Sequence, residues 1–143
     1  MKTLITLALL IFTTLALQAQ SLRLAAGVEK TVAGSQYSST LLFQIKSKWG
    51  LGAFYQTGLQ KLPEGIVKKD PFYGGVLFAP LTRTEKITFY ATLRCGVVNE
   101  KFLVVIPGLE TQVRIFNRVE ASFGMGYRMG YPSLSARVFT RIF

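Results

Sequence analysis

A strict alternation of apolar and polar side chains along Lys86–Val98 is the feature that most constrains this chain. Its apolar positions are Ile87, Phe89, Ala91, Leu93, Cys95 and Val97, and the positions between them are Thr88, Tyr90, Thr92, Arg94 and Gly96. Successive side chains of a β-strand point to opposite faces. A period of two over more than ten residues therefore predicts a long strand with one apolar face and one polar face.

The same alternation recurs along the chain and predicts eight strands, with no amphipathic helix. The expected strands are Leu22–Val28, Tyr37–Lys48, Trp49–Leu59, Asp70–Leu81, Lys86–Val98, Gly108–Phe116, Val119–Met129 and Ser133–Phe143. Asp70–Leu81 is the least regular, because it carries Phe72, Val76 and Phe78 on the face opposite Tyr73 and Leu77. The turns that follow the second, fourth and sixth of these strands are predicted to be short and to face the periplasm. The longest connection, Gln60–Asp70, joins the third and fourth strands.

The composition of the two faces favours a membrane barrel over a soluble sheet. The polar face carries eight glycines, which are Gly50, Gly52, Gly58, Gly74, Gly96, Gly108, Gly124 and Gly126. The interior of an eight-stranded barrel is narrow and filled by side chains, so glycines there leave room for arginines. Aromatic residues near the strand ends, such as Tyr37 and Trp49, suit interfacial girdles. The chain is therefore predicted to be an all-β, eight-stranded antiparallel up-and-down transmembrane β-barrel.

The first twenty residues have the organisation of a secretory signal peptide. Lys2 precedes the apolar run Leu4–Leu17, and Ala19 offers a small residue at a cleavage position. This predicts a signal peptide over 1–20 and a barrel domain over 21–143, with an uncleaved membrane anchor as the alternative. Removing Lys2 leaves 16 basic and 7 acidic residues, a net charge of +9. An exported chain meets no cytoplasmic nucleic acid, so acidic envelope groups such as lipopolysaccharide phosphates fit this charge better.

The last predicted strand, Ser133–Phe143, is amphipathic and stops on an aromatic residue. With its export signal and strand pattern, the chain resembles the small eight-stranded outer-membrane barrels of Gram-negative bacteria. The resemblance implies an outer-membrane location and a terminal strand that the barrel-assembly machinery reads, with Phe139 and Phe143 as the assembly signal. Both phenylalanines share a register with Arg137 and Arg141. Either this strand contains a bulge, or Phe143 does not face lipid.

Charged residues on the polar faces are predicted to project into the lumen. This lumen charge network consists of Arg23, Glu29, Lys46, Arg94, Glu110, Arg114, Glu120, Arg128 and Arg137. Unpaired buried charges are costly, so these residues are expected to form ion pairs that fill the lumen. The functional alternative is acid–base chemistry on membrane lipid through Glu110, Glu120 and Ser122.

Other chemistry is restricted by what the chain lacks. It contains no histidine, which removes Ser-His-Asp triads and most zinc sites, and no cofactor or metal is expected. The single cysteine, Cys95, lies between apolar neighbours and is interpreted as a lipid-facing or packed residue.

The loop Gln60–Asp70 carries Lys61, Lys68 and Lys69 and is predicted to lie outside the cell. We expect it to contact lipopolysaccharide phosphates or an acidic partner, or to be a solvated loop. The predicted function is an integral outer-membrane barrel with a structural or interaction role, surrounded by outer-membrane lipid and without catalysis. The alternatives are a soluble periplasmic ligand-binding barrel, with the apolar row turned inward, and a subunit of a larger envelope assembly.

Overall fold

The computed structural model of this chain describes residues 6, 20–32, 34–45, 47–61, 67–69, 71–128 and 130–143. Apart from Thr6 and Gln20, the predicted signal peptide lies outside the described residues. Within those ranges, no helix is both long and apolar enough to cross a membrane.

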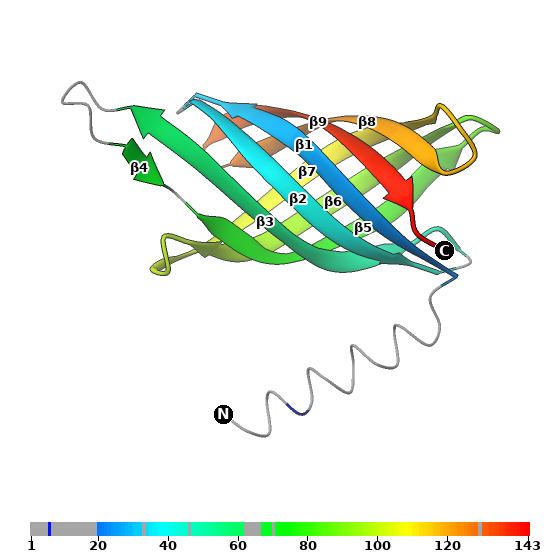
Figure 1. Cartoon of the computed structure of the whole chain (residues 1–143), viewed down its shortest axis with the longest axis horizontal. Helices are drawn as coiled ribbons and strands as arrows, with labels where there is room; N and C mark the ends of the chain where they lie inside the picture. Colours follow the sequence, from blue (N-terminus) through cyan, green and yellow to red (C-terminus); the bar gives the residue numbers. More distant parts are fainter. Residues whose placement is uncertain are drawn as a thin grey trace.

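Eight long antiparallel strands close into a barrel (Figure 1). They are β1 (Ser21–Thr31), β2 (Gly34–Gln44), β3 (Gly50–Lys61), β5 (Phe72–Arg83), β6 (Ile87–Val98), β7 (Phe102–Arg114), β8 (Val119–Arg128) and β9 (Tyr131–Arg141). Each pairs with the next long strand along the chain, and β1 pairs with β9 to close the sheet. The predicted eight-stranded up-and-down barrel is therefore confirmed.

The two mouths of the barrel differ in their connections (Figure 1). At one mouth β1 begins and β9 ends, and the short connections that follow β2, β5 and β7 lie there. We call this the terminal mouth. The opposite mouth, the loop mouth, holds the connections that follow β1, β3, β6 and β8. This arrangement agrees with the short hairpins predicted for one side of the membrane.

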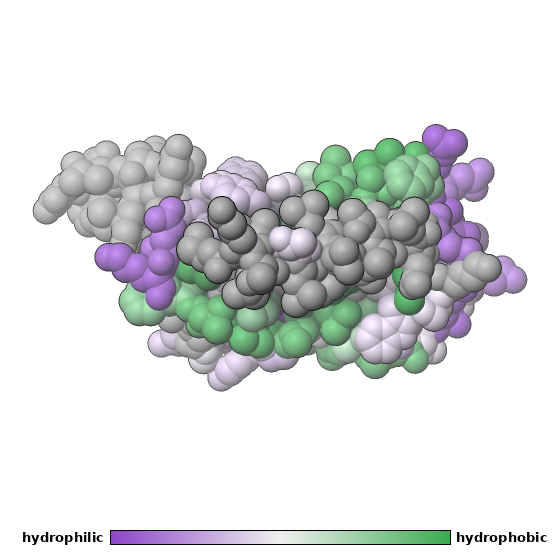
Figure 2. All heavy atoms as spheres, turned by 90° about the horizontal axis from the view of Figure 1, so that it is seen from below, coloured by the Kyte–Doolittle hydropathy of each residue, from purple (hydrophilic) through white to green (hydrophobic). Residues whose placement is uncertain are grey.

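The apolar row of each strand faces outward. Leu93 on β6, Leu109 on β7 and Phe123 on β8 are all exposed. Figure 2 shows hydrophobic side chains along the visible wall of the barrel and hydrophilic side chains at its two ends. This is the distribution of a protein whose wall contacts lipid. It is the reverse of the arrangement that the soluble ligand-binding alternative requires.

One sector of the lumen is apolar, which the alternating sequence pattern did not predict. The inward face of β5 buries Phe72, Val76 and Phe78. The Phe72 ring meets Phe54 of β3 edge-on, with centroids 4.7 Å apart, and Phe78 meets Tyr90 of β6 at 5.6 Å. Since one face of β5 contacts lipid and the other contacts this aromatic sector, its sequence is apolar on both faces.

The bounds of β7 differ from the prediction for the same reason. The strand begins at Phe102, six residues before the predicted start at Gly108. In this first part of β7, Val104 and Ile106 are buried in the apolar sector while Leu103 and Val105 face outward. Residues 102–106 therefore show no alternation of polarity. The pairing of β7 with β8 begins at Gly108, directly after Pro107, which has no N–H to donate to a neighbouring strand.

The predicted loop over Gln60–Asp70 is partly strand. β3 continues to Lys61, and β4 (Val67–Lys69) pairs antiparallel with its last three residues. The expectation of a loop is therefore wrong at Lys61, Lys68 and Lys69, whose backbone forms a hairpin extension of β3. Residues 62–66 and Asp70 lie outside the described residues.

Two inward glycines face each other across neighbouring strands. Gly74 of β5 pairs with Gly96 of β6 on the inward face. A Cβ atom at Gly74 would run into the carbonyl oxygen of Cys95, and one at Gly96 would run into that of Tyr73. Glycine is required here because neighbouring backbone occupies the space of a side chain.

Candidate functional site: the lumen charge network and the barrel mouths

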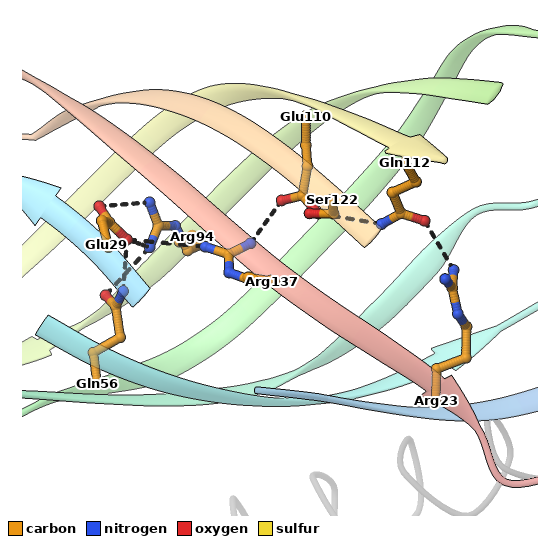
Figure 3. Close-up of polar contacts among 8 residues, drawn as sticks. All are labelled: Arg23, Glu29, Gln56, Arg94, Glu110, Gln112, Ser122 and Arg137. Atoms are coloured by element: carbon orange, nitrogen blue, oxygen red, sulfur yellow. Dashed lines mark hydrogen bonds and ion pairs between the residues drawn. The ribbon is translucent and has the colours of Figure 1, made fainter. Parts of the chain in front are cut away.

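The carboxylate of Glu29 on β1 is fully buried and anchors the first half of the network (Figure 3). Arg94 of β6 forms an ion pair with it, and its Nη2 also donates to Glu29 Oε1 at 3.1 Å. Gln56 of β3 joins both residues. Its Nε2 donates to Glu29 Oε2 at 2.6 Å, and its Oε1 accepts from Arg94 Nη1 at 3.2 Å. Three strands are thereby connected across the lumen by one carboxylate.

Glu110 on β7 anchors the second half (Figure 3). Arg137 Nη1 donates to its Oε2 at 2.6 Å, while Ser122 Oγ and Gln112 Nε2 donate to its Oε1 at 2.6 and 3.2 Å. Arg137 Nη2 also lies 3.9 Å from Glu29 Oε2. Arg137 therefore bridges the two buried carboxylates.

Arg23 extends the network toward the terminal mouth. Its Nη1 donates to Gln112 Oε1 at 3.0 Å, and its guanidinium forms an ion pair with Glu120. The same guanidinium lies 4.7 Å from the ring centroid of Phe139, within cation–π range. A continuous series of contacts thus runs from Glu29 to Glu120 inside the barrel.

In this arrangement each buried carboxylate is paired with an arginine and accepts further hydrogen bonds from neighbouring side chains. Both oxygens of Glu110 accept hydrogen bonds, and Ser122 uses its hydroxyl proton in one of them. Ser122 and Glu110 are both buried in the lumen, away from the lipid-facing wall where a membrane-lipid substrate would lie. Buried carboxylates held by arginine, amide and hydroxyl donors from other strands link those strands, which is a structural role.

Seven of the nine predicted network residues lie in the lumen, and the other two are Arg114 and Lys46. Arg128 lies toward the loop mouth, where it donates to Gln36 Oε1 at 2.6 Å and stacks 4.8 Å from the centroid of Phe72. Arg114, by contrast, is exposed at the end of β7. The prediction that it joins the lumen network is wrong, because its strand ends at the mouth. Lys46 lies outside the described residues.

Sequence reasoning did not include three amide or hydroxyl members of the network, which are Gln56, Gln112 and Ser122. A glutamine amide both donates and accepts, so it can join a carboxylate to an arginine. The available signal was register, since each of these residues alternates with apolar residues on its own strand.

The two phenylalanines of the expected assembly signal lie in different environments. Phe139 is fully buried in the lumen, with its ring 6.0 Å from that of Phe78. β9 pairs with β8 without a register shift from Tyr131 to Thr140. Phe143 follows the end of β9 and is exposed. β9 therefore contains no bulge in its pairing with β8. Whether Phe143 faces lipid, and whether these residues are recognised in assembly, stay predictions.

Cys95 is a free, exposed cysteine on the outward face of β6. In the part of the chain that the structure describes, no group of histidine, cysteine, aspartate or glutamate side chains is arranged to hold a metal ion.

Comparison with solved structures identifies the fold. A chain from the "De novo design of transmembrane beta-barrels" matches with a TM-score of 0.68 and 8% identity, covering 87% of this chain and 97% of its own. The outer membrane protein Ail of Yersinia pestis, in a phospholipid bilayer nanodisc, matches with a TM-score of 0.60 and 11% identity, covering 85% and 99%. The de novo designed barrel TMB2.3 matches with a TM-score of 0.62 and 16% identity, covering 86% of this chain and 96% of its own.

No protein-family model and no curated protein matches the sequence. At these identities the structural matches establish the fold. The chain has the fold of the small eight-stranded outer-membrane β-barrels of Gram-negative bacteria.

Proposed function

We propose that this protein is a closed outer-membrane barrel that acts through its two mouths, in a structural or interaction role, without catalysis and without a wide pore. The observation that carries the proposal is the lumen charge network. Glu29, Arg94, Arg137 and Glu110 bind one another across the lumen. Arg23 of the same network lies over the ring of Phe139, which in turn meets the ring of Phe78. A barrel of eight strands has room for little more than such side chains.

Conductance across a planar bilayer tests this proposal. The folded protein is expected to insert without a steady ion current, because the network occupies the path between the mouths. A Glu29→Ala variant, which removes the carboxylate shared by Arg94 and Arg137, is the comparison. A steady current through the unmodified protein would contradict the proposal and favour an anion path lined by the arginines.

The hairpin extension of β3 and β4 is the proposed contact with the outer surface. Lys61, Lys68 and Lys69 lie on this extension at the loop mouth. We infer that they bind lipopolysaccharide phosphates, since clustered cations attract polyanions at an interface. Lys68→Glu with Lys69→Glu is expected to weaken binding of purified lipopolysaccharide and to leave the folded barrel intact. Equal binding by the variant would exclude this contact, and loss of folding would show that the hairpin is placed wrongly.

Export and processing form part of the same proposal. We propose that the signal peptide ends at Ala19 or Gln20 and that the mature barrel accordingly begins at Gln20 or Ser21. The intact mass of the protein recovered from outer membranes tests this directly. A mass that still includes residues 1–19 would favour the uncleaved anchor.

A further inference from the structure

Two adjoining hollows open at the terminal mouth, and Lys48 lines both. The first, of about 420 Å³, also has Gln44, Ser21 and Arg141 in its wall. The second, of about 320 Å³, has Arg83 and Leu81 in its wall. Lys48 therefore lines a hollow with each of two arginines that are far apart in the sequence, Arg83 at the end of β5 and Arg141 at the end of β9.

The position of Lys48 is fixed by its turn. Its backbone adopts a left-handed φ of 68°, and its N–H donates to the carbonyl of Ile45 at 2.9 Å. The buried amide of Gln44 donates to the Lys48 carbonyl at 3.2 Å and to Tyr90 Oη at 3.1 Å. The Gln44 amide therefore connects the turn to a side chain in the lumen, which restrains the backbone that carries the Lys48 ammonium group.

The second hollow is shaped by a bulge in β5. The pairing with β6 shifts between Pro80 and Thr82, so that Leu81 is the extra residue. Bulges at barrel rims bend a strand and redirect the residues that follow. Here the bulge leaves Leu81 exposed and places Arg83 in the same hollow as Lys48. The hollow thus has an apolar side next to its cationic side.

The terminal mouth concentrates positive charge around Lys48. Burial lowers the pKa of the Lys48 ammonium, and the nearby charges of Arg83 and Arg141 lower it further. The carboxylate that acts in the other direction, Glu120, is already paired with Arg23. Among the described residues, Lys48, Arg83 and Arg141 form no ion pair with a carboxylate, and Glu85 in the adjacent turn is exposed.

We propose that the terminal mouth binds the phosphate group of an anionic phospholipid, with Lys48, Arg83 and Arg141 as its cationic ligands. Guanidinium groups bind phosphate oxygens through paired N–H donors, and an ammonium group adds a point charge. The exposed Leu81 beside the cations continues the apolar outer wall, so that acyl chains run along the barrel while the headgroup occupies the hollow. With the terminal mouth toward the periplasm, as the turn lengths predict, this lipid belongs to the inner leaflet.

A binding titration tests the proposal with a reporter that the chain already carries. Trp49, the single tryptophan, follows Lys48 directly and is exposed. The purified folded protein in uncharged detergent micelles is titrated with dihexanoyl phosphatidylglycerol, with dihexanoyl phosphatidylcholine and with inorganic phosphate, while Trp49 emission is recorded. Saturable binding of phosphatidylglycerol, much weaker binding of phosphatidylcholine and inorganic phosphate, and weakening by added salt are expected.

Variants separate this site from general attraction to a basic protein. Lys48→Gln with Arg141→Gln is expected to weaken phosphatidylglycerol binding about tenfold or more, which corresponds to loss of charge-assisted hydrogen bonds. The control removes two exposed lysines at the loop mouth, Lys30→Gln with Lys101→Gln, and is expected to bind as the unmodified protein does. Arg83→Gln alone, at the exposed end of β5, is expected to weaken phosphatidylglycerol binding about threefold. This single variant replaces the double variant in the test if the double variant does not fold.

Three outcomes would overturn the proposal. One is equal binding of phosphatidylglycerol and phosphatidylcholine, and another is equal loss of binding in the control and the terminal-mouth variants. The third is binding of inorganic phosphate as tight as that of phosphatidylglycerol, which would replace the lipid with a free-phosphate site. None of these results depends on the lipopolysaccharide contact proposed for the opposite mouth.

Discussion

At the scale of single residues, Glu29 has the greatest influence on the interior. It is fully buried, and it receives Arg94, Gln56 and Arg137 from three other strands. The gain from such a pair over an apolar core is small, but removal of one partner leaves an uncompensated buried charge. The ion pair therefore adds little to the free energy of unfolding, but removal of one partner lowers that free energy substantially.

The substitution Glu29→Gln is expected to lower the free energy of unfolding by about 3–5 kcal/mol, because it leaves Arg94 and Arg137 without one carboxylate. Urea unfolding of the barrel in lipid vesicles measures this. The matched control is Glu85→Gln, in an exposed turn, where the change is expected to stay within about 0.5 kcal/mol. Equal effects at the two positions would mean that Glu29 is not buried against arginines.

At the scale of elements, adjacent glycines on β5 have opposite requirements. Gly74 faces inward, where the backbone of β6 occupies the place of a Cβ atom. At Gly75, a Cβ atom would only touch the carbonyl oxygen of Gly52 at an ordinary 3.8 Å. The inward glycine is therefore needed for the close approach of β5 and β6, and the outward one is not.

Gly74→Ala is expected to destabilise the barrel by about 1–3 kcal/mol, since the strands must separate to admit the methyl group. Gly75→Ala is expected to be neutral or to stabilise it by up to about 1 kcal/mol, because alanine restricts the unfolded chain more than glycine does. Chemical unfolding of both variants under the same conditions checks the pair. The reverse order of stabilities would indicate that the two faces of β5 are exchanged.

At the scale of the whole molecule, the outward apolar face determines where the protein resides. Leu93 lies near the middle of β6 and is exposed on the outer wall, whereas Leu103 is the second residue of β7 and lies near the loop mouth. In a bilayer these positions differ in depth. The cost of a charge on the lipid face is greatest at the midplane and small at the interfaces.

Leu93→Arg is expected to lower the stability of the inserted barrel by about 2–4 kcal/mol, and Leu103→Arg by no more than about 1 kcal/mol. The yield of folded protein in outer membranes, read as the heat-dependent mobility of unboiled and boiled samples, compares them. A normal yield of folded Leu93→Arg protein would contradict the assignment of this row to the lipid side.

Much of the fold was predictable because its signal is local. β6 and β8 were expected within two residues of their observed bounds, since their polar and apolar faces contrast clearly. The start of β7 and the strand character of Lys68 and Lys69 were missed. Residues 102–106 are apolar on both faces because they lie between lipid and the aromatic sector, and period-two patterning cannot reveal a strand with two similar faces.

The sequence by itself determined which residues face lipid and which face the lumen, because side-chain alternation in a strand requires only near neighbours. The tertiary structure decided which charges meet. Arg94 pairs with Glu29 from 65 positions away, and Arg23 pairs with Glu120 rather than with Glu29 on its own strand. Closure of the sheet also brought Lys48, Arg83 and Arg141 to one mouth. Such meetings depend on the tilt and stagger of strands around the closed barrel, which no single segment specifies.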